Sequence, residues 1–417
     1  MSATRRSFFS WTRNACAAGG LVSAAPAVAE AKSAAGEDYY CKLGITKIIN
    51  AAGAYTALTA SIMPQSVQSA VADAAKHSVR LAELQQKAGA YIAKRLKCEG
   101  ALVCAGAASA LTLGTAACMT VGNQEVINIL PIEASGLKNE VIIQKSHRYG
   151  YDHALRNCGI RFVEVETSDQ YENAFTDRTV MCHFFNAAEE GHIPREEWVA
   201  VAHRHGVPCF NDAAADVPPI SNLWNYTEMG FDLVTFSGGK GLRGPQNAGL
   251  LLGRKDLIEA AGWNNNPNSD TVGRGMKVAK EQIIGMVAAV DWLLDQTDDD
   301  MQKEFLRRAE HIASLLRDIP TLRHEIFVPP IANAVPHLFI RYDANRVRKT
   351  PLEISQILRD GSPAIELNPS TGHKPGSGGP GLPGGQDTIV VGVWMLQPGE
   401  EMIVGRRLRE VLLKAST

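Results

Sequence analysis

The stretch Ser-Gly-Gly-Lys-Gly-Leu-Arg-Gly-Pro-Gln, at positions 237–246, decides how the rest of this chain is interpreted. It follows the apolar run 231–236, whose composition predicts a buried strand. Glycines on both sides of Lys240 let the backbone turn sharply and approach a ligand closely. A lysine in such a turn at a strand end indicates a Schiff-base lysine for pyridoxal phosphate. A surface lysine in a tight turn is the alternative.

Two segments upstream favour the cofactor interpretation. The run 207–212 predicts a second buried strand, which ends in Asp212. A carboxylate against the pyridine nitrogen makes pyridoxal phosphate a better electron sink, although a helix N-cap is an alternative role for Asp212. The segment 103–110 predicts a strand end that leads into a helix N-terminus, where free N–H groups suit a phosphate. The candidate phosphate contacts are Gly106, Ala107, Ala108, Ser109 and the hydroxyl of Ser237.

The order of these elements along the chain resembles a known family. Asp-Ala-Ala-Ala at 212–215, the lysine stretch at 237–246 and Gly-Leu-Leu-Leu-Gly-Arg-Lys-Asp-Leu-Ile at 249–258 resemble the selenocysteine synthase group of fold-type I pyridoxal-phosphate enzymes. That group includes L-seryl-tRNA(Sec) selenium transferase and D-glucosaminate-6-phosphate ammonia-lyase. The similarity extends over roughly residues 40 to 415.

The resemblance implies pyridoxal 5'-phosphate as the cofactor, Lys240 as its Schiff base and Asp212 at its pyridine nitrogen. It also implies that Arg274 and Lys277 face the anionic part of the substrate, and that His147 stacks on the cofactor ring. In the family, the stretch 361–368 often ends in arginine, whereas this chain has Asn368.

Short apolar runs alternate with helical stretches along the chain, and this pattern predicts an α/β fold with a mostly parallel sheet. The predicted strands are 102–103, 141–143, 162–165, 180–185, 207–211, 233–236 and 249–252, and apolar positions recur at helical spacing from about 65 to 97. We expect a fold-type I transferase architecture with a smaller C-terminal α/β domain. The expected boundaries are an arm over 38–65, a large cofactor-binding domain over 66–295 and a small domain over 296–417, to which 32–65 could contribute. The Gly- and Pro-rich segment 369–385 predicts a surface loop, with a mobile lid as the alternative.

These residues favour a lyase that acts on a small amino acid or amino sugar acid. Lys240 would remove the α-proton, the ring held by Asp212 would take up the charge, and loss of a β-substituent would follow. Replacement, as in selenium transfer, racemisation and aldol cleavage share the same early chemistry and remain alternatives. A catalytically dead binding or assembly protein of the same fold is the non-enzyme alternative.

Residues 1–31 predict an export signal. Thr-Arg-Arg-Ser-Phe-Phe at 4–9 resembles a twin-arginine motif, and a weakly apolar stretch and the small residues 27–29 follow it. We therefore expect a periplasmic enzyme, with a cytoplasmic one as the alternative. No later run is long and apolar enough for a stable membrane anchor.

Charge and cysteine content limit the partners. The formal net charge of −2 gives no electrostatic case for nucleic acid, so we expect a small-molecule substrate and not tRNA. The eight cysteines include no close pairs, and Cys104, Cys182 and Cys209 lie in apolar runs that predict burial. We expect no metal site. The resemblance implies a homodimer or a higher homo-oligomer.

Overall fold

The computed structural model describes residues 37–186, 193–330, 332–374, 382 and 384–416. The chain divides into two compact units, Met1–Thr46 and Lys47–Thr417. In the first unit, the described residues contain the short helix α1 (Tyr39–Lys42). The side chain of Asp38 caps this helix by accepting hydrogen bonds from the backbone N–H groups of Tyr40 and Cys41. The predicted signal over 1–31 lies outside the described residues.

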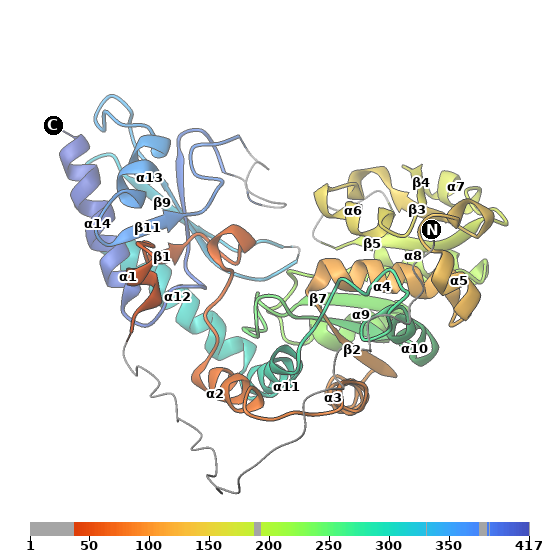
Figure 1. Ribbon diagram of the computed structural model, residues 1–417. Coiled ribbons are helices and arrows are strands. Elements are labelled where there is room, and N and C mark those ends of the chain that lie inside the picture. The colour runs from red at the N-terminus through yellow and green to blue at the C-terminus, as the bar shows by residue number, and fades with distance from the viewer. Residues whose placement is uncertain (1–36, 187–192, 331, 375–381, 383, 417) are drawn as a thin grey trace, which may run out of the picture. The chain divides into compact units, whose positions relative to one another are not determined.

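A seven-stranded sheet forms the centre of the second unit, with the strand order β2-β8-β7-β6-β5-β3-β4 (Figure 1). Its strands are β2 (Gly100–Cys104), β3 (Glu140–Gln144), β4 (Arg161–Val165), β5 (Thr179–Phe185), β6 (Cys209–Asp212), β7 (Leu233–Ser237) and β8 (Gly249–Gly253). Strand β8 is antiparallel to β2 and β7, and the other pairs are parallel. The predicted fold class and all seven predicted strands are confirmed.

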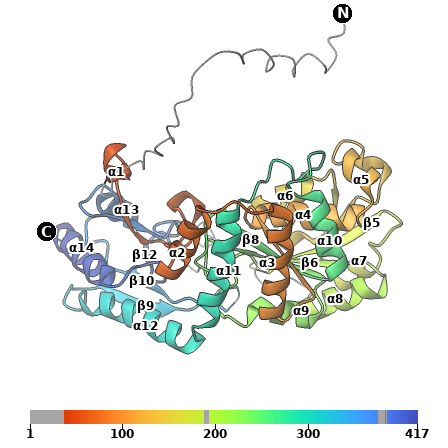
Figure 2. The same ribbon diagram turned by 60° about the horizontal axis from the view of Figure 1, so that its bottom comes forward.

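Helices cover both faces of this sheet (Figure 2). The helices of this part are α2 (Gln65–Ala74), α3 (Leu81–Arg95), α4 (Ala107–Thr120), α5 (Gln124–Ile129), α6 (His153–Arg156), α7 (Ser168–Glu172), α8 (Arg195–Arg204), α9 (Asn222–Met229), α10 (Lys255–Asn264) and α11 (Lys280–Leu294). Helix α2 packs on α11, and α5 packs on α4. Buried residues of α3, α8, α9 and α11 form one apolar cluster with the strands, and those of α4, α6 and α10 form another. Short 3₁₀ turns lie at η1 (Thr56–Leu58), η2 (Ala134–Gly136), η3 (Lys145–His147) and η4 (Gly150–Asp152).

The apolar positions that recur at helical spacing over 65–97 belong to two helices, α2 and α3. The break covers residues 75–80, between α2 and α3. Lys76, His77 and Ser78 are exposed there, and Val79 is 55% exposed, so no side chain in the break is buried in the core. Helical spacing alone does not reveal such a break, because the apolar pattern resumes beyond it.

The C-terminal residues form a second core. Its elements are α12 (Asp298–Ser314), β9 (Arg323–Phe327), β10 (His337–Arg341), α13 (Pro351–Arg359), β11 (Ala364–Leu367), β12 (Thr388–Gly392) and α14 (Glu400–Ala415). Strands β12, β10 and β9 form an antiparallel sheet in that order, while β11 pairs in parallel with β1 (Ile48–Ala51). Residues of α12, α13, α14 and β1 share one apolar cluster with these strands.

In the segment 369–385, the described residues form turns and irregular backbone, whereas residues 375–381 and 383 lie outside the described part of the chain. Among the described residues, no helix has the length and apolar character that crossing a membrane requires. Cys104, Cys182 and Cys209 are free and buried, as predicted.

Candidate active site

Asp212 and Lys240 lie at the same edge of the central sheet. Asp212 is the last residue of β6, and Lys240 lies three residues after the end of β7, the strand that pairs with β6 in parallel. The backbone N–H of Ser237 donates to the carbonyl oxygen of Ala214 at 3.2 Å, which joins the two strand exits. Ligands of parallel α/β folds bind at this carboxyl edge. The fold therefore places the two principal predicted residues where a ligand would lie.

Close packing holds the loop that carries Lys240. A Cβ atom at Gly241 would lie 2.1 Å from the carbonyl oxygen of Val217, and one at Gly238 would lie 2.6 Å from that of Ala248. Both glycines are therefore required by the close approach of backbone to backbone. Burial lowers the pKa of the Lys240 amine, although the charges of Asp212 and Asp216 partly oppose this effect. A lower pKa increases the neutral fraction of the amine, which is the form that acts as nucleophile or base.

The carboxylate of Asp212 is buried and hydrogen-bonded. Its Oδ1 accepts from the backbone N–H of Ala214 at 3.0 Å, and its Oδ2 accepts from the hydroxyl of Tyr149. Burial raises the pKa of Asp212, while these two hydrogen bonds and the charge of Lys240 lower it in part. An ionised carboxylate has about four acceptor positions, so Asp212 can accept a further N–H. Asp212 can therefore hold a protonated pyridine nitrogen.

Tyr149 and His183 support Asp212, and sequence reasoning missed both as site residues. The hydroxyl of Tyr149 lies 3.4 Å from Nε2 of His183, and its ring stacks on Phe185 with centroids 3.9 Å apart. Burial and the charge of Asp212 raise the pKa of Tyr149, so its hydroxyl remains a donor. Burial lowers the pKa of His183 to about 3, which keeps the imidazole neutral.

The N-terminus of α4 supplies the candidate phosphate site. Its N-cap is Gly106, in the left-handed region at φ 86°, and the first helical residues are Ala107, Ala108 and Ser109. The first N–H groups of a helix have no partner within the helix. The side chain of Ser109 is 6% exposed, and its Oγ has no hydrogen-bond partner among the described residues. An unpartnered buried hydroxyl beside free N–H groups fits a phosphate.

His147 is a predicted site residue that is hydrogen-bonded to neither Asp212 nor Lys240. His147 is buried, accepts from the backbone N–H of Phe185 at 3.3 Å and meets Phe184 edge to face. Burial lowers its pKa to about 4. Tyr149 is the aromatic side chain that contacts Asp212. Stacking of His147 on the cofactor ring stays a prediction.

Arg274 is half-buried and Lys277 is exposed. Neither side chain makes a hydrogen bond or an ion pair within the described ranges. A Cβ atom at Gly273 would lie 2.7 Å from the side chain of Leu113, so the segment with Arg274 passes beside α4. Both cationic groups remain available to an anionic ligand, and their predicted role is unchanged.

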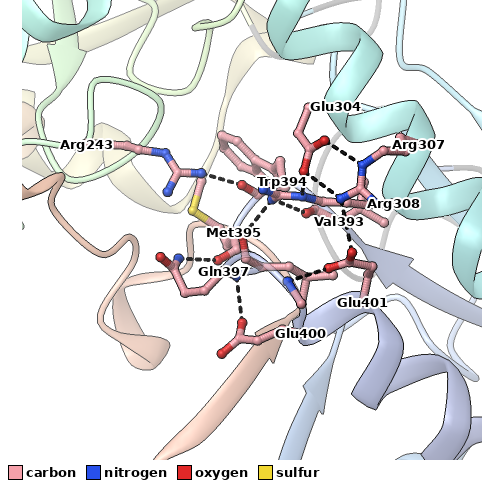
Figure 3. A network of polar contacts seen from close by, with 12 residues as sticks. Arg243, Glu304, Arg307, Arg308, Val393, Trp394, Met395, Gln397, Glu400 and Glu401 are labelled. Atoms are coloured by element: carbon pink, nitrogen blue, oxygen red, sulfur yellow. Dashed lines mark hydrogen bonds and ion pairs between the residues drawn. The ribbon is translucent and has the colours of Figure 1, made fainter.

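Two arginines donate hydrogen bonds to the backbone of segment 393–396, which follows β12 (Figure 3). Arg308 donates from Nη1 to the carbonyl oxygens of Val393 at 3.3 Å and Leu396 at 2.6 Å. Arg243, from the lysine loop, donates to the carbonyl oxygen of Trp394. Burial, and to a smaller extent the charge of Arg308, lowers the pKa of Arg243 to about 10. The loop that carries Lys240 and Arg243 is thereby hydrogen-bonded to the segment after β12.

Asn368 has a structural role in this chain. Its Nδ2 donates to the carbonyl oxygen of Ala52 at 2.9 Å and to the hydroxyl of Tyr55 at 3.1 Å, and its Oδ1 accepts from the backbone N–H of Ser370 at 2.9 Å. The side chain is 2% exposed. Asn368 thus joins the exit of β1 to the segment after β11, and it brings no positive charge to this position.

The donor set fits pyridoxal phosphate. Lys240 offers an amine, Asp212 a buried carboxylate, and the start of α4 an anion site with the orphan hydroxyl of Ser109. These are the three groups that the aldehyde, the ring nitrogen and the phosphate of this cofactor require. No cluster of three His, Cys, Asp or Glu side chains suited to a metal ion occurs in the described part of the chain.

Fold and site together define a pyridoxal-phosphate-dependent enzyme of fold type I. The model of the L-seryl-tRNA selenium transferase family matches residues 48–308, more than half of the chain, and the chain belongs to this family. The resemblance seen in the sequence is thereby confirmed at the level of the family.

Two curated relatives match nearly the whole chain. The 5'-C-glycyluridine monooxygenase-decarboxylase of Streptomyces sp is 28% identical over 90% of this chain and 92% of its own length. The D-glucosaminate-6-phosphate ammonia lyase of Salmonella typhimurium is 26% identical over 89% of this chain and 97% of its own. A solved structure of D-glucosaminate-6-phosphate ammonia-lyase superposes with a TM-score of 0.77 at 25% identity, covering 91% of this chain and all of that one. The selenium transferase of Aquifex aeolicus matches only 51% of this chain.

Proposed function

We propose that this protein is a pyridoxal-phosphate-dependent lyase that eliminates a β-substituent from a small amino acid or amino sugar acid. One observation carries the proposal: the partly desolvated amine of Lys240 and the buried carboxylate of Asp212 follow adjacent parallel strands. The cofactor, when bound, supplies an electron sink that stabilises negative charge at the α-carbon of the substrate.

The chain's own residues supply binding and proton transfer. Lys240 would hold the cofactor until an amino substrate replaces it, and its free Nζ would then take the α-proton. Asp212 would keep a proton on the ring nitrogen, with Tyr149 holding the carboxylate in place. The start of α4, Ser109 and Ser237 would bind the phosphate, and Arg274 and Lys277 would face an anionic group of the substrate. Loss of the β-substituent would follow, and water would then displace the amino group as ammonia.

The extent of similarity supports a small-molecule substrate. Relatives named for small substrates align with about nine-tenths of this chain, whereas the Aquifex relative named for seryl-tRNA aligns with about half. The formal net charge of −2 supports the same choice, since tRNA binding relies on basic surfaces.

The test is release of ammonia from D- and L-amino acids and from amino sugar acids, with and without a 6-phosphate. We expect turnover by the wild type, none by Lys240→Ala, and full activity in Lys255→Ala. Lys255 is a matched control because it is exposed and pairs only loosely with Glu259 at 3.9 Å. Equal activity of the wild type and Lys240→Ala would contradict the proposal.

The family name favours one second candidate, replacement of the β-substituent by a nucleophile. Replacement retains the amino group, whereas elimination releases it as ammonia. Measuring product with and without added thiol or selenide therefore separates the two reactions.

We further propose that the protein is a homodimer or a higher homo-oligomer and that residues 1–31 direct its export. The free cationic side chains of Arg274 and Lys277 are compatible with a site completed by assembly. Light scattering on the purified protein tests the first proposal. Cell fractionation of the wild type and of an Arg5→Lys, Arg6→Lys variant tests the second, since we expect only the wild type in the periplasm.

A further inference from the structure

Arg243 lies in the same tight turn as Lys240. Its backbone N–H donates to the carbonyl oxygen of Lys240 at 3.0 Å, and the N–H of Gly244 then returns to the carbonyl oxygen of Gly238 at 2.7 Å. A turn closed in this way keeps the Cα atoms of its first and last residues within about 7 Å. The backbone of Arg243 is in the left-handed region at φ 50°. This conformation is unfavourable for a residue with a side chain, and such strain gathers at functional sites.

The guanidinium of Arg243 has few partners in the protein. It donates one hydrogen bond, from Nη2 to the backbone carbonyl oxygen of Trp394 (Figure 3). No Asp or Glu side chain forms an ion pair with it in the part of the chain that the structure describes. Its Nε and Nη1 are not enclosed by protein atoms, so both can still donate. An arginine has five N–H donors, and most of those of Arg243 are therefore available to a ligand.

The single carbonyl partner does not account for the charge of Arg243. One N–H satisfies this carbonyl oxygen, and an uncharged side chain could supply it. Burial and the neighbouring charge of Arg308 both act against the charged form. Arg308 has a counter-ion, because Glu304 accepts from its Nε at 2.8 Å, whereas Arg243 has none among the described residues. A partly buried charge is costly unless an opposite charge pairs with it, so Arg243 indicates an anionic ligand.

The side chains beside Trp394 cannot replace Arg243 in this role, because they are uncharged. A Cβ atom at Gly53 would lie 3.1 Å from the ring of Tyr55 and 3.3 Å from Nε1 of Trp394, so the two rings meet at this glycine. The hydroxyl of Tyr55 accepts from Nδ2 of Asn368 at 3.1 Å. Within this group of residues, Arg243 alone supplies a positive charge.

We propose that Arg243 binds the carboxylate on the α-carbon of an amino acid substrate and thereby selects substrates that carry this group. A planar guanidinium matches a carboxylate through two parallel N–H donors. Lys240 would act at the α-carbon, and the turn holds Arg243 close to Lys240, so a carboxylate on that same carbon meets the guanidinium. Arg274 and Lys277 are then left for a second anionic group. The identity of the ligand as an amino acid rests on the proposed function.

The experiment compares two inert probes that differ only in the carboxylate. They are the borohydride-reduced adducts of pyridoxal phosphate with serine and with ethanolamine, and the serine probe is made from both the D- and the L-isomer. Each probe is titrated into the cofactor-free, full-length protein, and its dissociation constant is measured by calorimetry. Hydrogen bonds to a charged group change affinity by a factor of about 10 to 100. The wild type should therefore bind the better serine probe about 10- to 100-fold more tightly than the ethanolamine probe.

Arg243→Gln removes the charge and keeps an N–H donor for the carbonyl oxygen of Trp394. This variant should lose most of the preference for the serine probe and should bind the ethanolamine probe like the wild type. Arg243→Lys keeps a charge without the planar fork, so it should retain part of the preference. Gln397→Ala is the matched control, because Nε2 of Gln397 donates to the carbonyl oxygen of Met395 at 3.1 Å in the same segment. This control disturbs the segment without changing a charge, and it should keep the full preference.

Equal binding of the two probes by the wild type would overturn the proposal, and this result does not depend on the folding of any variant. An undiminished preference in Arg243→Gln, or an equal loss in Gln397→Ala, would overturn it as well. Weaker binding of both probes to the same extent in Arg243→Gln would assign the arginine to the cofactor and not to the substrate. Binding of neither probe would contradict the proposed cofactor site, whereas equal binding of both contradicts this inference alone.

Discussion

Gly249 is the residue at which the candidate phosphate site should be most sensitive to a single methyl group. It begins β8, and its backbone pairs with Cys104 on one side and Ser237 on the other. A Cβ atom at this position would lie 2.6 Å from the carbonyl carbon of Gly106 and 2.7 Å from the backbone nitrogen of Ala107. The conflict is thus with the backbone at the start of α4.

The size of the effect follows from these distances. Ordinary contact begins at 3.4 Å, so Gly249→Ala must open the 2.6 Å gap by roughly 0.8 Å, an overpacking change that costs about 1 to 3 kcal/mol. Since β8 is paired on both sides, the start of α4 is the part that moves. A cost of 1.4 kcal/mol corresponds to about a tenfold change in affinity. We therefore expect the dissociation constant of pyridoxal phosphate to rise about 10- to 100-fold.

The assay is titration of purified apoprotein with pyridoxal phosphate, followed by absorbance, alongside thermal unfolding. Gly262→Ala is the matched control: no atom lies within 4 Å of its Cβ position, and it lies in helix α10. This control should bind the cofactor like the wild type. If Gly249→Ala binds it equally tightly, the start of α4 is not the phosphate site.

Three further predictions concern the support of the site. Tyr149→Phe removes a hydrogen bond that lowers the pKa of Asp212, so the pKa of this carboxyl should rise. The pH below which pyridoxal phosphate no longer binds should therefore be higher in the variant, as measured by absorbance titration. The pKa of His183 lies well below its unfolded value, so its contribution to stability is present above about pH 6.5 and is lost as the pH falls. Between pH 7 and 5 the wild type should lose about 2 kcal/mol more than His183→Gln in urea unfolding, and equal slopes would refute this. Arg308→Met removes the buried donor of the Val393 and Leu396 carbonyl oxygens, while Glu304 keeps its hydrogen bonds from Arg307. It should lower the free energy of unfolding by about 2 to 4 kcal/mol, and an unchanged urea midpoint would argue against it.

The residues that could be predicted from the sequence are those whose signal is local. Gly106, Asp212 and Lys240 each follow an apolar run, and the end of a strand is where a parallel sheet binds ligands. The seven strands were equally visible as apolar runs. The direction of β8 was not, because an apolar run has the same composition in a parallel and an antiparallel pair.

The residues that could not be predicted depend on contacts distant in sequence. Tyr149 meets Asp212 across 63 positions, and this contact exists only because β3, β5 and β6 are neighbours in the sheet. Arg243 is visible in the sequence, but only its backbone conformation and its lack of an acidic partner among the described residues distinguish it from an ordinary loop arginine. Strand order and burial are global properties, so no local pattern reports them.

The central claim is that Lys240 holds pyridoxal phosphate. The most direct measurement is the visible absorption spectrum of the purified protein and its Lys240→Ala variant, each recorded before and after addition of the cofactor. The account predicts a band of lysine-bound cofactor in the wild type that is missing or shifted in the variant. A wild type that remains colourless after pyridoxal phosphate is added would contradict it.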